Sequence, residues 1–405
     1  MRNRQTVLSA VLILAAFAAA GADWPQFRGS ESSSIADATP PLEFDVASGK
    51  NVAWSTPLPG RGASSPIVVA GRVYVTASSG ANQDRLHVLC FDSADGKQLW
   101  ERQFWATGRT LCHPTSSIAA PTPASDGQRI FAFYSSNDLV CLDLDGNLQW
   151  YRGLTYDHPT AANDVGMASS PLVVGPLVIV QVECLGDSFA AAIDTTTGET
   201  RWRIDRPKVM NWCSPVLLHG KQPGADLILL QGPDGISAHD PKTGRAVWSI
   251  DRKCNGIPSP VVHDEVIYLA SEGLTALGKR STAGDPEILW ATKQLDPASS
   301  SPVVQDGSVY VLNRAGALTC GDADTGEVKW RLRLKGSFWA TPVVAGNYLF
   351  AANSDGEIIT VKLGDQGEIV ATSALGEPVY GSPAVAGGAM FVRSDAHLSK
   401  IAEQQ

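Results

Sequence analysis

The sequence predicts an all-β protein, an eight-bladed β-propeller whose blades are four-stranded antiparallel sheets. Three observations support this prediction. A turn followed by a tryptophan recurs along the chain, and a Ser-Pro or Thr-Pro pair recurs in step with it. The 405 residues also include 38 glycines and 25 prolines, a composition that favours many tight turns.

The first repeated pattern spaces an aspartate, a glycine and a tryptophan at even steps, as in DTTTGETRW at residues 194–202. Aspartate and glycine favour a tight turn between two strands, and the recurrence indicates that the tryptophan is architecture rather than a site. Degenerate copies end at Trp290, without the aligned aspartate, and at Ala371, where Leu363 replaces the aspartate. Complete or one-residue-shorter copies end at Trp100, Trp150, Trp248 and Trp330.

The second repeated pattern is a serine or threonine before a proline that opens a short apolar run. Successive prolines of these pairs are 40 to 57 residues apart, close to the period of a four-stranded propeller blade. Within one unit, residues 301–334, short β-rich runs alternate with turn sequences, which fits four strands. The eight pairs are Ser65-Pro66, Thr122-Pro123, Ser170-Pro171, Ser214-Pro215, Ser259-Pro260, Ser301-Pro302, Thr341-Pro342 and Ser382-Pro383.

The two ends of the chain are predicted to complete one blade together. The last repeat, which starts at Ser382, has room for three strands. Residues of about 50–58 have the pattern of an outermost strand that carries Trp54. Pairing of this N-terminal strand with the last repeat would close the ring and protect two sheet edges.

The N-terminus has the pattern of a secretory signal peptide over residues 1–22, with a charged MRNR start, an apolar run and small residues at Ala20 and Ala22. We therefore expect export to the periplasm of residues 23–405 as a single propeller domain. No other segment approaches the roughly twenty apolar residues of a membrane span. The first cysteine is Cys90, so we expect no lipid anchor at the cleavage point.

Charge and cysteine content limit the partners and the crosslinks. The net charge of −9, without a basic cluster after residue 4, argues against nucleic acid as a partner. Seven cysteines allow up to three disulfides in an oxidising compartment. We favour burial as small core residues for Cys90, Cys141 and Cys320, whereas Cys213 and Cys254 are candidates for a bridge across the rim of the ring.

With these repeats the chain resembles bacterial eight-bladed propellers built from PQQ-like repeats, a superfamily shared by quinoprotein alcohol dehydrogenases and the outer-membrane assembly factor BamB. The opening WPQFRG at residues 24–29 also resembles the start of many exported members. The resemblance implies that the tryptophans dock between blades, against the glycine-bearing turn of the adjoining sheet. The docking residues are then Trp54, Trp100, Trp150, Trp202, Trp248, Trp290 and Trp330.

Two adjacent loops, 101–121 and 151–169, are longer than their counterparts. Most repeats place 12 or 13 residues between the docking tryptophan and the next marker proline, but these two place 23 and 21. Extra length in a repeat loop usually lies on one face, often the binding face. We predict a polar pocket or a partner-recognition rim there; the alternative is that the loops only cap the channel mouth.

The candidate binding residues come from these loops and from three aromatic positions. Trp212, Trp339 and Tyr380 each precede a marker proline by three positions and are predicted to point toward the same mouth. They either stack a planar ligand or, as we favour, plug the channel. The loop candidates are Trp105, Arg109, Cys112, His113, Tyr156, Asp157, His158, Asn163 and Asp164.

The enzyme hypothesis lacks support from motifs. The resemblance to quinoprotein dehydrogenases implies adjacent cysteines, calcium ligands and an aspartate base, but no two cysteines are adjacent here. No metal-ligand spacing, nucleophile elbow or phosphate loop occurs. Polar candidates near the predicted top face are Asn163, Asp164, Glu183 and Asp296. We predict no catalytic residue, no metal site and no cofactor.

The sequence therefore predicts an exported, non-catalytic scaffold that binds a protein or peptide partner in the cell envelope. The alternative is an enzyme like the quinoprotein dehydrogenases, or a protein that binds PQQ with calcium. The identity of the partner and the oligomeric state stay open at this stage.

Overall fold

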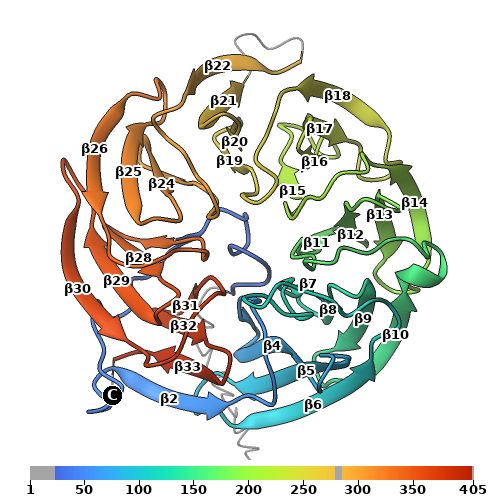
Figure 1. Ribbon diagram of the computed structural model, residues 1–405, viewed down its shortest axis with the longest axis horizontal. Coiled ribbons are helices and arrows are strands. Elements are labelled where there is room, and N and C mark those ends of the chain that lie inside the picture. The colour runs from blue at the N-terminus through green and yellow to red at the C-terminus, as the bar shows by residue number, and fades with distance from the viewer. Residues whose placement is uncertain (1–22, 279–284, 404–405) are drawn as a thin grey trace, which may run out of the picture.

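Eight β-sheets form blades around a central axis in this computed structural model, which describes residues 23–278 and 285–403 (Figure 1). In the first seven blades the chain runs from the innermost strand to the outermost and then enters the next blade. The predicted fold class is confirmed. One additional strand, β1 (Ile35–Ala36), pairs in parallel with the innermost strand of the seventh blade.

The innermost strands are short and lie around the axis, and the second strands are mostly longer and buried. In blade order, the innermost strands are β3 (Ile67–Val69), β7 (Ala124–Ser125), β11 (Leu172–Val174), β15 (Val216–Leu218), β19 (Val261–His263), β23 (Val303–Gln305), β27 (Val343–Ala345) and β31 (Ala384–Ala386). The second strands are β4 (Arg72–Ser79), β8 (Arg129–Phe133), β12 (Leu177–Val182), β16 (Leu227–Gly232), β20 (Val266–Ala270), β24 (Ser308–Leu312), β28 (Tyr348–Ala352) and β32 (Ala389–Arg393).

The third strands are also largely buried, whereas the outermost strands expose most of their side chains. The third strands are β5 (Arg85–Asp92), β9 (Asp138–Asp143), β13 (Phe189–Asp194), β17 (Gly235–His239), β21 (Leu274–Gly278), β25 (Ala317–Asp322), β29 (Glu357–Lys362) and β33 (His397–Ile401). The outermost strands are β6 (Gln98–Trp105), β10 (Leu148–Gly153), β14 (Thr200–Asp205), β18 (Ala246–Asp251), β22 (Glu287–Thr292), β26 (Val328–Arg333), β30 (Glu368–Ala374) and, in the eighth blade, β2 (Val52–Pro57). A short 3₁₀ helix, η1 (Leu154–Tyr156), follows β10.

The DTTTGETRW stretch forms the turn from β13 to β14. Oδ1 of Asp194 accepts hydrogen bonds from the amides of Thr196 and Thr197, each at 2.9 Å. Gly198 supplies the left-handed backbone that the turn needs, with φ at 73°. Arg201 donates to Oδ2 of Asp194 at 2.8 Å, and this bond is the main reason that the pKa of Asp194 falls to about 2.

Trp202 lies in the seam between the third and fourth blades. Its Nε1 donates to the carbonyl of Pro241 at 2.7 Å, and a Cβ at Gly244 would come within 2.7 Å of the indole. The turn therefore needs a glycine because the indole occupies the space of a side chain. The same bond to a backbone carbonyl of the next blade is made by Trp54, Trp100, Trp150, Trp290 and Trp330.

The fifth-blade turn follows a degenerate repeat and falls partly on residues 279–284, which lie outside the described residues. Trp248, in the outermost strand of the fourth blade, is buried. In the seventh blade, where Ala371 replaces the tryptophan, Gly367 still contacts Trp330 of the preceding blade.

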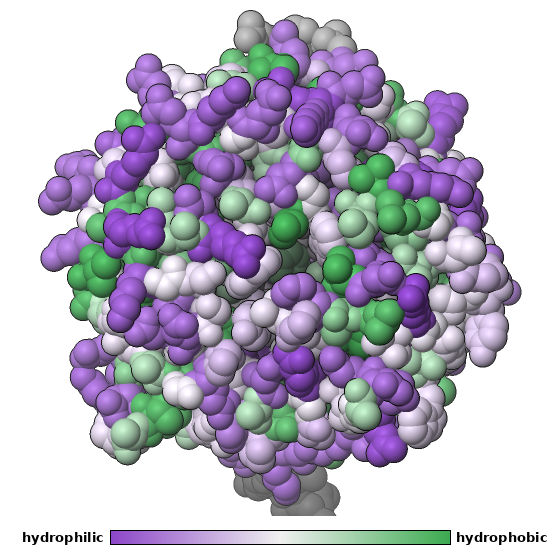
Figure 2. All heavy atoms as spheres, in the orientation of Figure 1, coloured by the Kyte–Doolittle hydropathy of each residue, from purple (hydrophilic) through white to green (hydrophobic). Residues whose placement is uncertain are grey.

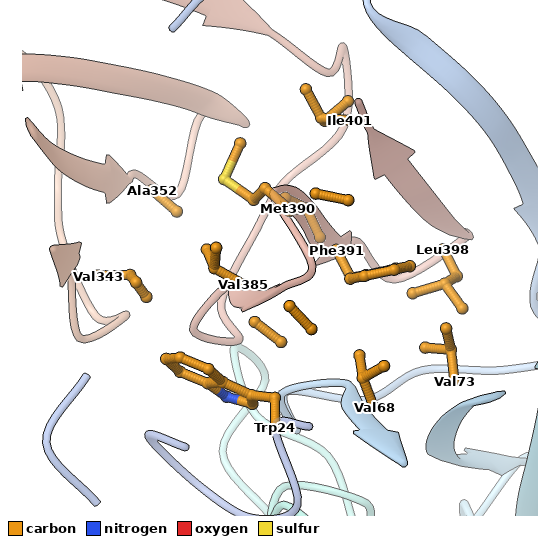
Figure 3. Packing of buried hydrophobic residues seen from close by; sticks show 14 of the residues in the cluster. Trp24, Val68, Val73, Val343, Ala352, Val385, Met390, Phe391, Leu398 and Ile401 are labelled. Atoms are coloured by element: carbon orange, nitrogen blue, oxygen red, sulfur yellow. The ribbon is translucent and has the colours of Figure 1, made fainter. Parts of the chain in front are cut away.

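The hydrophobic core is divided among the seams, since each cluster of buried side chains draws residues from neighbouring blades. The largest cluster joins the seventh, eighth and first blades and includes Trp24. In Figure 3 the indole of Trp24 lies beside Val385 and Val68, which belong to innermost strands. Each blade is thus stabilised mainly by its neighbours, which is the physical basis of a closed ring.

The eight Ser/Thr-Pro pairs form a belt around the channel. The amide of Ser65 donates to the hydroxyl oxygen of Thr122 at 2.9 Å, and the amide of Thr122 donates to that of Ser170 at 3.0 Å. The same bond continues blade by blade as far as Ser382. Each hydroxyl from Thr122 to Ser382 therefore satisfies a backbone amide of the preceding blade, whereas the buried hydroxyl of Ser65 has no hydrogen-bond partner among the described residues.

The N-terminal strand closes the ring as predicted. β2 pairs antiparallel with β33, with Trp54 opposite Lys400, so the eighth blade combines both ends of the chain. The expected range of about 50–58 corresponds to Val52–Pro57. The predicted signal peptide, residues 1–22, lies outside the described residues.

The segment before β2 fills one end of the channel, a role that the sequence analysis did not assign to it. Trp24 exchanges two backbone hydrogen bonds with Val68, and Arg28 donates from Nη2 to the carbonyl of Pro260 at 2.8 Å. The side chain of Phe27 borders a second space, a cavity on the other side of the belt that is described below. We call residues 23–36 the plug; it crosses the centre of the ring in Figure 1.

All seven cysteines are free thiols, and Cys112 is the one that is not fully buried. The bridge considered between Cys213 and Cys254 is therefore absent. Burial raises the pKa of the Cys90 and Cys141 thiols to about 12, so these side chains behave as small core residues, as predicted.

Candidate functional site

A funnel of about 390 Å³ opens at the mouth of the channel where the outermost strands connect to the next innermost strands. All eight belt hydroxyl residues line it, together with His113, and Phe27 of the plug also borders it. Figure 2 shows one face of the ring, on which hydrophobic residues lie among polar ones around a central hollow. The lining combines hydroxyl groups with apolar surface.

The three aromatic residues predicted at this mouth all line the funnel. Nε1 of Trp212 donates to the carbonyl of Gly166 in the second long loop at 2.8 Å. The guanidinium carbon of Arg314 lies 3.9 Å from the ring centroid of Trp339, a cation–π contact. Tyr380 completes the set and is half-buried. These rings narrow the mouth, and each keeps part of its surface exposed.

The two long connections begin later than the sequence predicts. Residues 101–105 and 151–153 belong to β6 and β10, and η1 follows β10, so the loops proper are shorter than 101–121 and 151–169. Strands β4, β5 and β6 each extend to eight residues in the first blade. The number of residues between a docking tryptophan and the next marker proline shows that a connection is long. It does not show how much of that length belongs to the strand.

The two long loops contact each other directly. Nη1 of Arg109 lies 2.7 Å from Oδ1 of Asp164, and the amide of His113 donates to the carbonyl of Val165 at 3.1 Å. Asn163 is buried and accepts a hydrogen bond from the amide of Val165 at 3.1 Å. The loops therefore form one continuous surface beside the funnel.

A buried turn of the second blade, residues 135–138, anchors both loops, and the sequence analysis missed it. The carboxylate of Asp138 accepts hydrogen bonds from the hydroxyl of Thr107 and from that of Tyr151, each at 2.6 Å. Nδ2 of Asn137 donates to the carbonyl of Ala161 in the second loop at 2.7 Å. The residues of this turn are of types common in turns, so only their contacts in the folded protein reveal that they anchor the loops.

Besides Arg109, Cys112, Asn163 and Asp164, four more of the predicted rim residues lie outside the funnel lining, namely Trp105, Tyr156, Asp157 and His158. Trp105 is 63% exposed and Tyr156 is 78% exposed. The guanidinium carbon of Arg85 lies 4.9 Å from the ring centroid of Trp105. Asp157 pairs with Arg152 at 2.7 Å. His158 packs against Phe189, with ring centroids 4.0 Å apart; burial, with the charge of Arg203 nearby, lowers the pKa of His158. These four side chains extend the surface outward over the second and third blades.

Of the fifteen large hydrophobic side chains that are exposed in the described residues, six lie near the starts of outermost strands and one, Val46, precedes β2, whereas the other eight lie on this loop face. They lie at the ends of outermost strands or in the connections that share this rim, over the first five blades. They are Trp105, Leu111, Tyr156, Val165, Leu185, Val209, Met210 and Ile257. Exposed apolar groups that gather on one face indicate an interaction surface.

A buried polar cluster lies beneath this face in the third and fourth blades. The side chain of Glu183 is fully buried and accepts a hydrogen bond from Nε of Arg206 at 2.6 Å. Gln181 donates to the same carboxylate oxygen at 2.8 Å. Burial raises the pKa of Glu183, although Arg206 opposes the rise. Of the other polar candidates, Asp164 and Asp296 are exposed.

The funnel and this cluster do not fit PQQ with calcium. PQQ is a tricarboxylate, and His113 is the one lining residue of the funnel that can carry a positive charge. Glu183, the buried carboxylate on this side, is neutralised by Arg206 and does not line the funnel. Among the described residues, no group of three or more His, Cys, Asp or Glu side chains is placed to hold a metal ion.

A second cavity, of about 480 Å³, opens at the opposite mouth, between the plug and the ends of β15 and β19. Acidic residues and two histidines line it, and His219 lies 3.0 Å from Glu31. Both partners of this pair are exposed, so the contact contributes little to stability. This cavity could not be predicted from the sequence, because the plug forms one of its walls.

The fold and the repeats together define an eight-bladed propeller of PQQ-like repeats, with two long loops beside its funnel. The chain matches the family model described as outer membrane protein assembly factor BamB over residues 42–202, 186–283 and 280–366, and it belongs to this family. The BamB of Yersinia pestis is 23% identical over 328 residues, which is 76% of this chain and 77% of the relative.

Solved structures show the same fold. The BamB structure from Moraxella catarrhalis matches with a TM-score of 0.63 and 20% identity over 87% of this chain and 98% of that one. A europium-containing methanol dehydrogenase matches with a TM-score of 0.69 and 15% identity over 92% and 89% of the two chains. The quinohemoprotein alcohol dehydrogenase from Comamonas testosteroni matches with a TM-score of 0.68 and 14% identity over 95% of this chain and 81% of that one. At these identities the likeness establishes the fold alone.

Proposed function

We propose that this protein is an exported, non-catalytic scaffold that binds a protein or peptide partner of the cell envelope through its loop face. The observation that carries the proposal is the group of exposed hydrophobic side chains on loops that are held rigidly beside the funnel. The predicted signal peptide supports export, and the family match supports a role like that of BamB. In the described residues no helix has the length and apolar character to cross a membrane.

The anchoring of the loops favours binding because a rigid surface loses little conformational entropy when a partner docks. Tryptophan, tyrosine and arginine supply much of the binding energy in protein interfaces. Trp105, Tyr156 and Arg109 are exposed on this face, and Asp138 holds the loop between Trp105 and Arg109 in place. Partner recognition would therefore centre on the first two blades.

Replacing Trp105 and Tyr156 together by alanine is expected to reduce capture of the native partner about tenfold or more, since two aromatic anchors are lost. The measurement is crosslinking in the native envelope followed by quantitative identification of the captured protein. Thermal unfolding should change little because both side chains are exposed.

The matched control replaces exposed residues in the strand-connecting turns, Lys97 and Lys242, by alanine; capture should match that of the wild type. Equal capture by the loop variant and the wild type would disprove the proposed site.

We further propose that the protein works without a quinone cofactor. Because the funnel offers no arginine or lysine to a tricarboxylate, adding PQQ with calcium should leave the melting temperature unchanged and give no bound-quinone absorption spectrum. A clear rise in melting temperature together with a bound-quinone spectrum would instead establish the quinoprotein alternative.

A further inference from the structure

The plug carries a buried arginine at the centre of the ring. Arg28 is 1% exposed and sits in a left-handed backbone conformation, with φ at 67°. This conformation is unfavourable for a residue with a side chain and is retained only where the surroundings enforce it. The hydrogen bond from Nη2 to the carbonyl of Pro260 ties the guanidinium to the fifth blade.

The guanidinium of Arg28 has few partners in the protein; besides its bond to Pro260, its carbon lies 5.3 Å from the ring centroid of Phe27. Among the described residues, Nε and Nη1 have no acceptor, and no carboxylate forms a salt bridge with this side chain. Cys213 is nearby, but burial raises the pKa of its thiol well above the usual range, so it stays neutral. Burial lowers the pKa of Arg28 to about 9, which leaves the group charged at neutral pH. A buried charge without a counter-charge is strongly unfavourable.

A small cavity of about 10 Å³ lies against Arg28. A space of this size holds about one small sphere. Arg28 lines it together with the belt serines Ser170 and Ser214. The hydroxyl oxygen of Ser170 accepts a hydrogen bond from the amide of Thr122, and that of Ser214 accepts one from the amide of Ser170. Each hydroxyl can therefore still donate its own proton. The residues that line the cavity thus carry two hydroxyl donors and a cationic donor.

We propose that this cavity is a binding site for a single halide-sized anion, chloride under ordinary conditions. The anion accepts hydrogen bonds from the guanidinium of Arg28 and from the hydroxyls of Ser170 and Ser214, and it supplies the missing negative charge. Because Arg28 belongs to the plug and the serines belong to the third and fourth blades, the anion fastens the N-terminal segment to the ring. The site lies next to the funnel, because Ser170 and Ser214 line both.

The first test uses the unmodified protein. The melting temperature in sodium chloride should exceed that in sodium gluconate at equal ionic strength by about 2 to 4 °C, because gluconate is too large for the cavity. Crystals grown in sodium bromide should show an anomalous scattering peak beside the Arg28 guanidinium. Equal melting temperatures, or density that fits a water molecule without an anomalous peak, would overturn the proposal.

The second test removes the charge. In Arg28→Met the melting temperature should become the same in chloride and gluconate, and the bromide peak should disappear. The matched control, Arg245→Met, replaces an exposed arginine and should keep the chloride effect. If Arg28→Met does not fold, the bromide experiment on the wild type still decides the question. A chloride effect that survives in a folded Arg28→Met variant would place the anion elsewhere and contradict the proposal.

Discussion

Trp202→Ala is expected to lower the free energy of unfolding by about 3 to 5 kcal/mol, the usual cost of removing a large buried aromatic side chain. The indole is 8% exposed, donates to the carbonyl of Pro241 and covers Gly244 of the next blade. Its removal opens a cavity in the seam between two blades and leaves that carbonyl without its donor. The effect is large because each blade depends on its neighbours for burial.

Equilibrium unfolding in denaturant, followed by tryptophan fluorescence and circular dichroism, measures this loss. Trp105→Ala is the control, since Trp105 is 63% exposed, and it should cost less than about 1 kcal/mol. A cost below about 1 kcal/mol for Trp202→Ala as well would show that the seam does not depend on the indole.

Arg206→Met is expected to cost about 3 to 5 kcal/mol at neutral pH, because it leaves the fully buried carboxylate of Glu183 without its counter-charge. The loss should depend on pH. In the wild type, burial already raises the pKa of Glu183, and Arg206 limits that rise through its charge and its hydrogen bond. Without Arg206 the folded-state pKa must rise further.

The direction of this pH dependence of the free energy of unfolding follows from proton linkage. A carboxyl group whose pKa is higher in the folded state than in the unfolded state, about 4.3, favours folding at low pH. That contribution is lost as the pH rises through the folded-state pKa. The deficit of Arg206→Met should therefore be smaller at acidic pH and grow toward neutral and alkaline pH.

Unfolding free energies measured across this pH range test the prediction, and the double variant Arg206→Met with Glu183→Gln is the control. It should recover much of the stability at neutral pH and lose the pH dependence, because no buried carboxylate remains. A deficit in Arg206→Met that is equal at acidic and alkaline pH would contradict the assignment.

The repeats made the ring predictable, but the site was predicted only in part. Trp212, Trp339 and Tyr380 line the funnel, as their positions relative to the marker prolines indicated, and so does His113 of the first long loop. Trp105, Tyr156, Asp157 and His158 lie farther out, because part of the extra loop length went into strands and η1. Loop length can be counted from a sequence, whereas the direction of a loop depends on contacts such as those of Asp138.

The sequence by itself determined the number of blades, the strand order, the turn at Asp194 and the closure of the ring by β2. These features follow from local turn chemistry and from repetition, which each segment carries within itself. The tertiary structure alone decided the hydroxyl belt, the plug with its buried Arg28 and the pairing of Glu183 with Arg206. The belt and the plug join residues that are far apart in the sequence, and Glu183 and Arg206 come from two loops of the third blade that pack against the fourth. Their burial and charge balance exist only once the blades have come together.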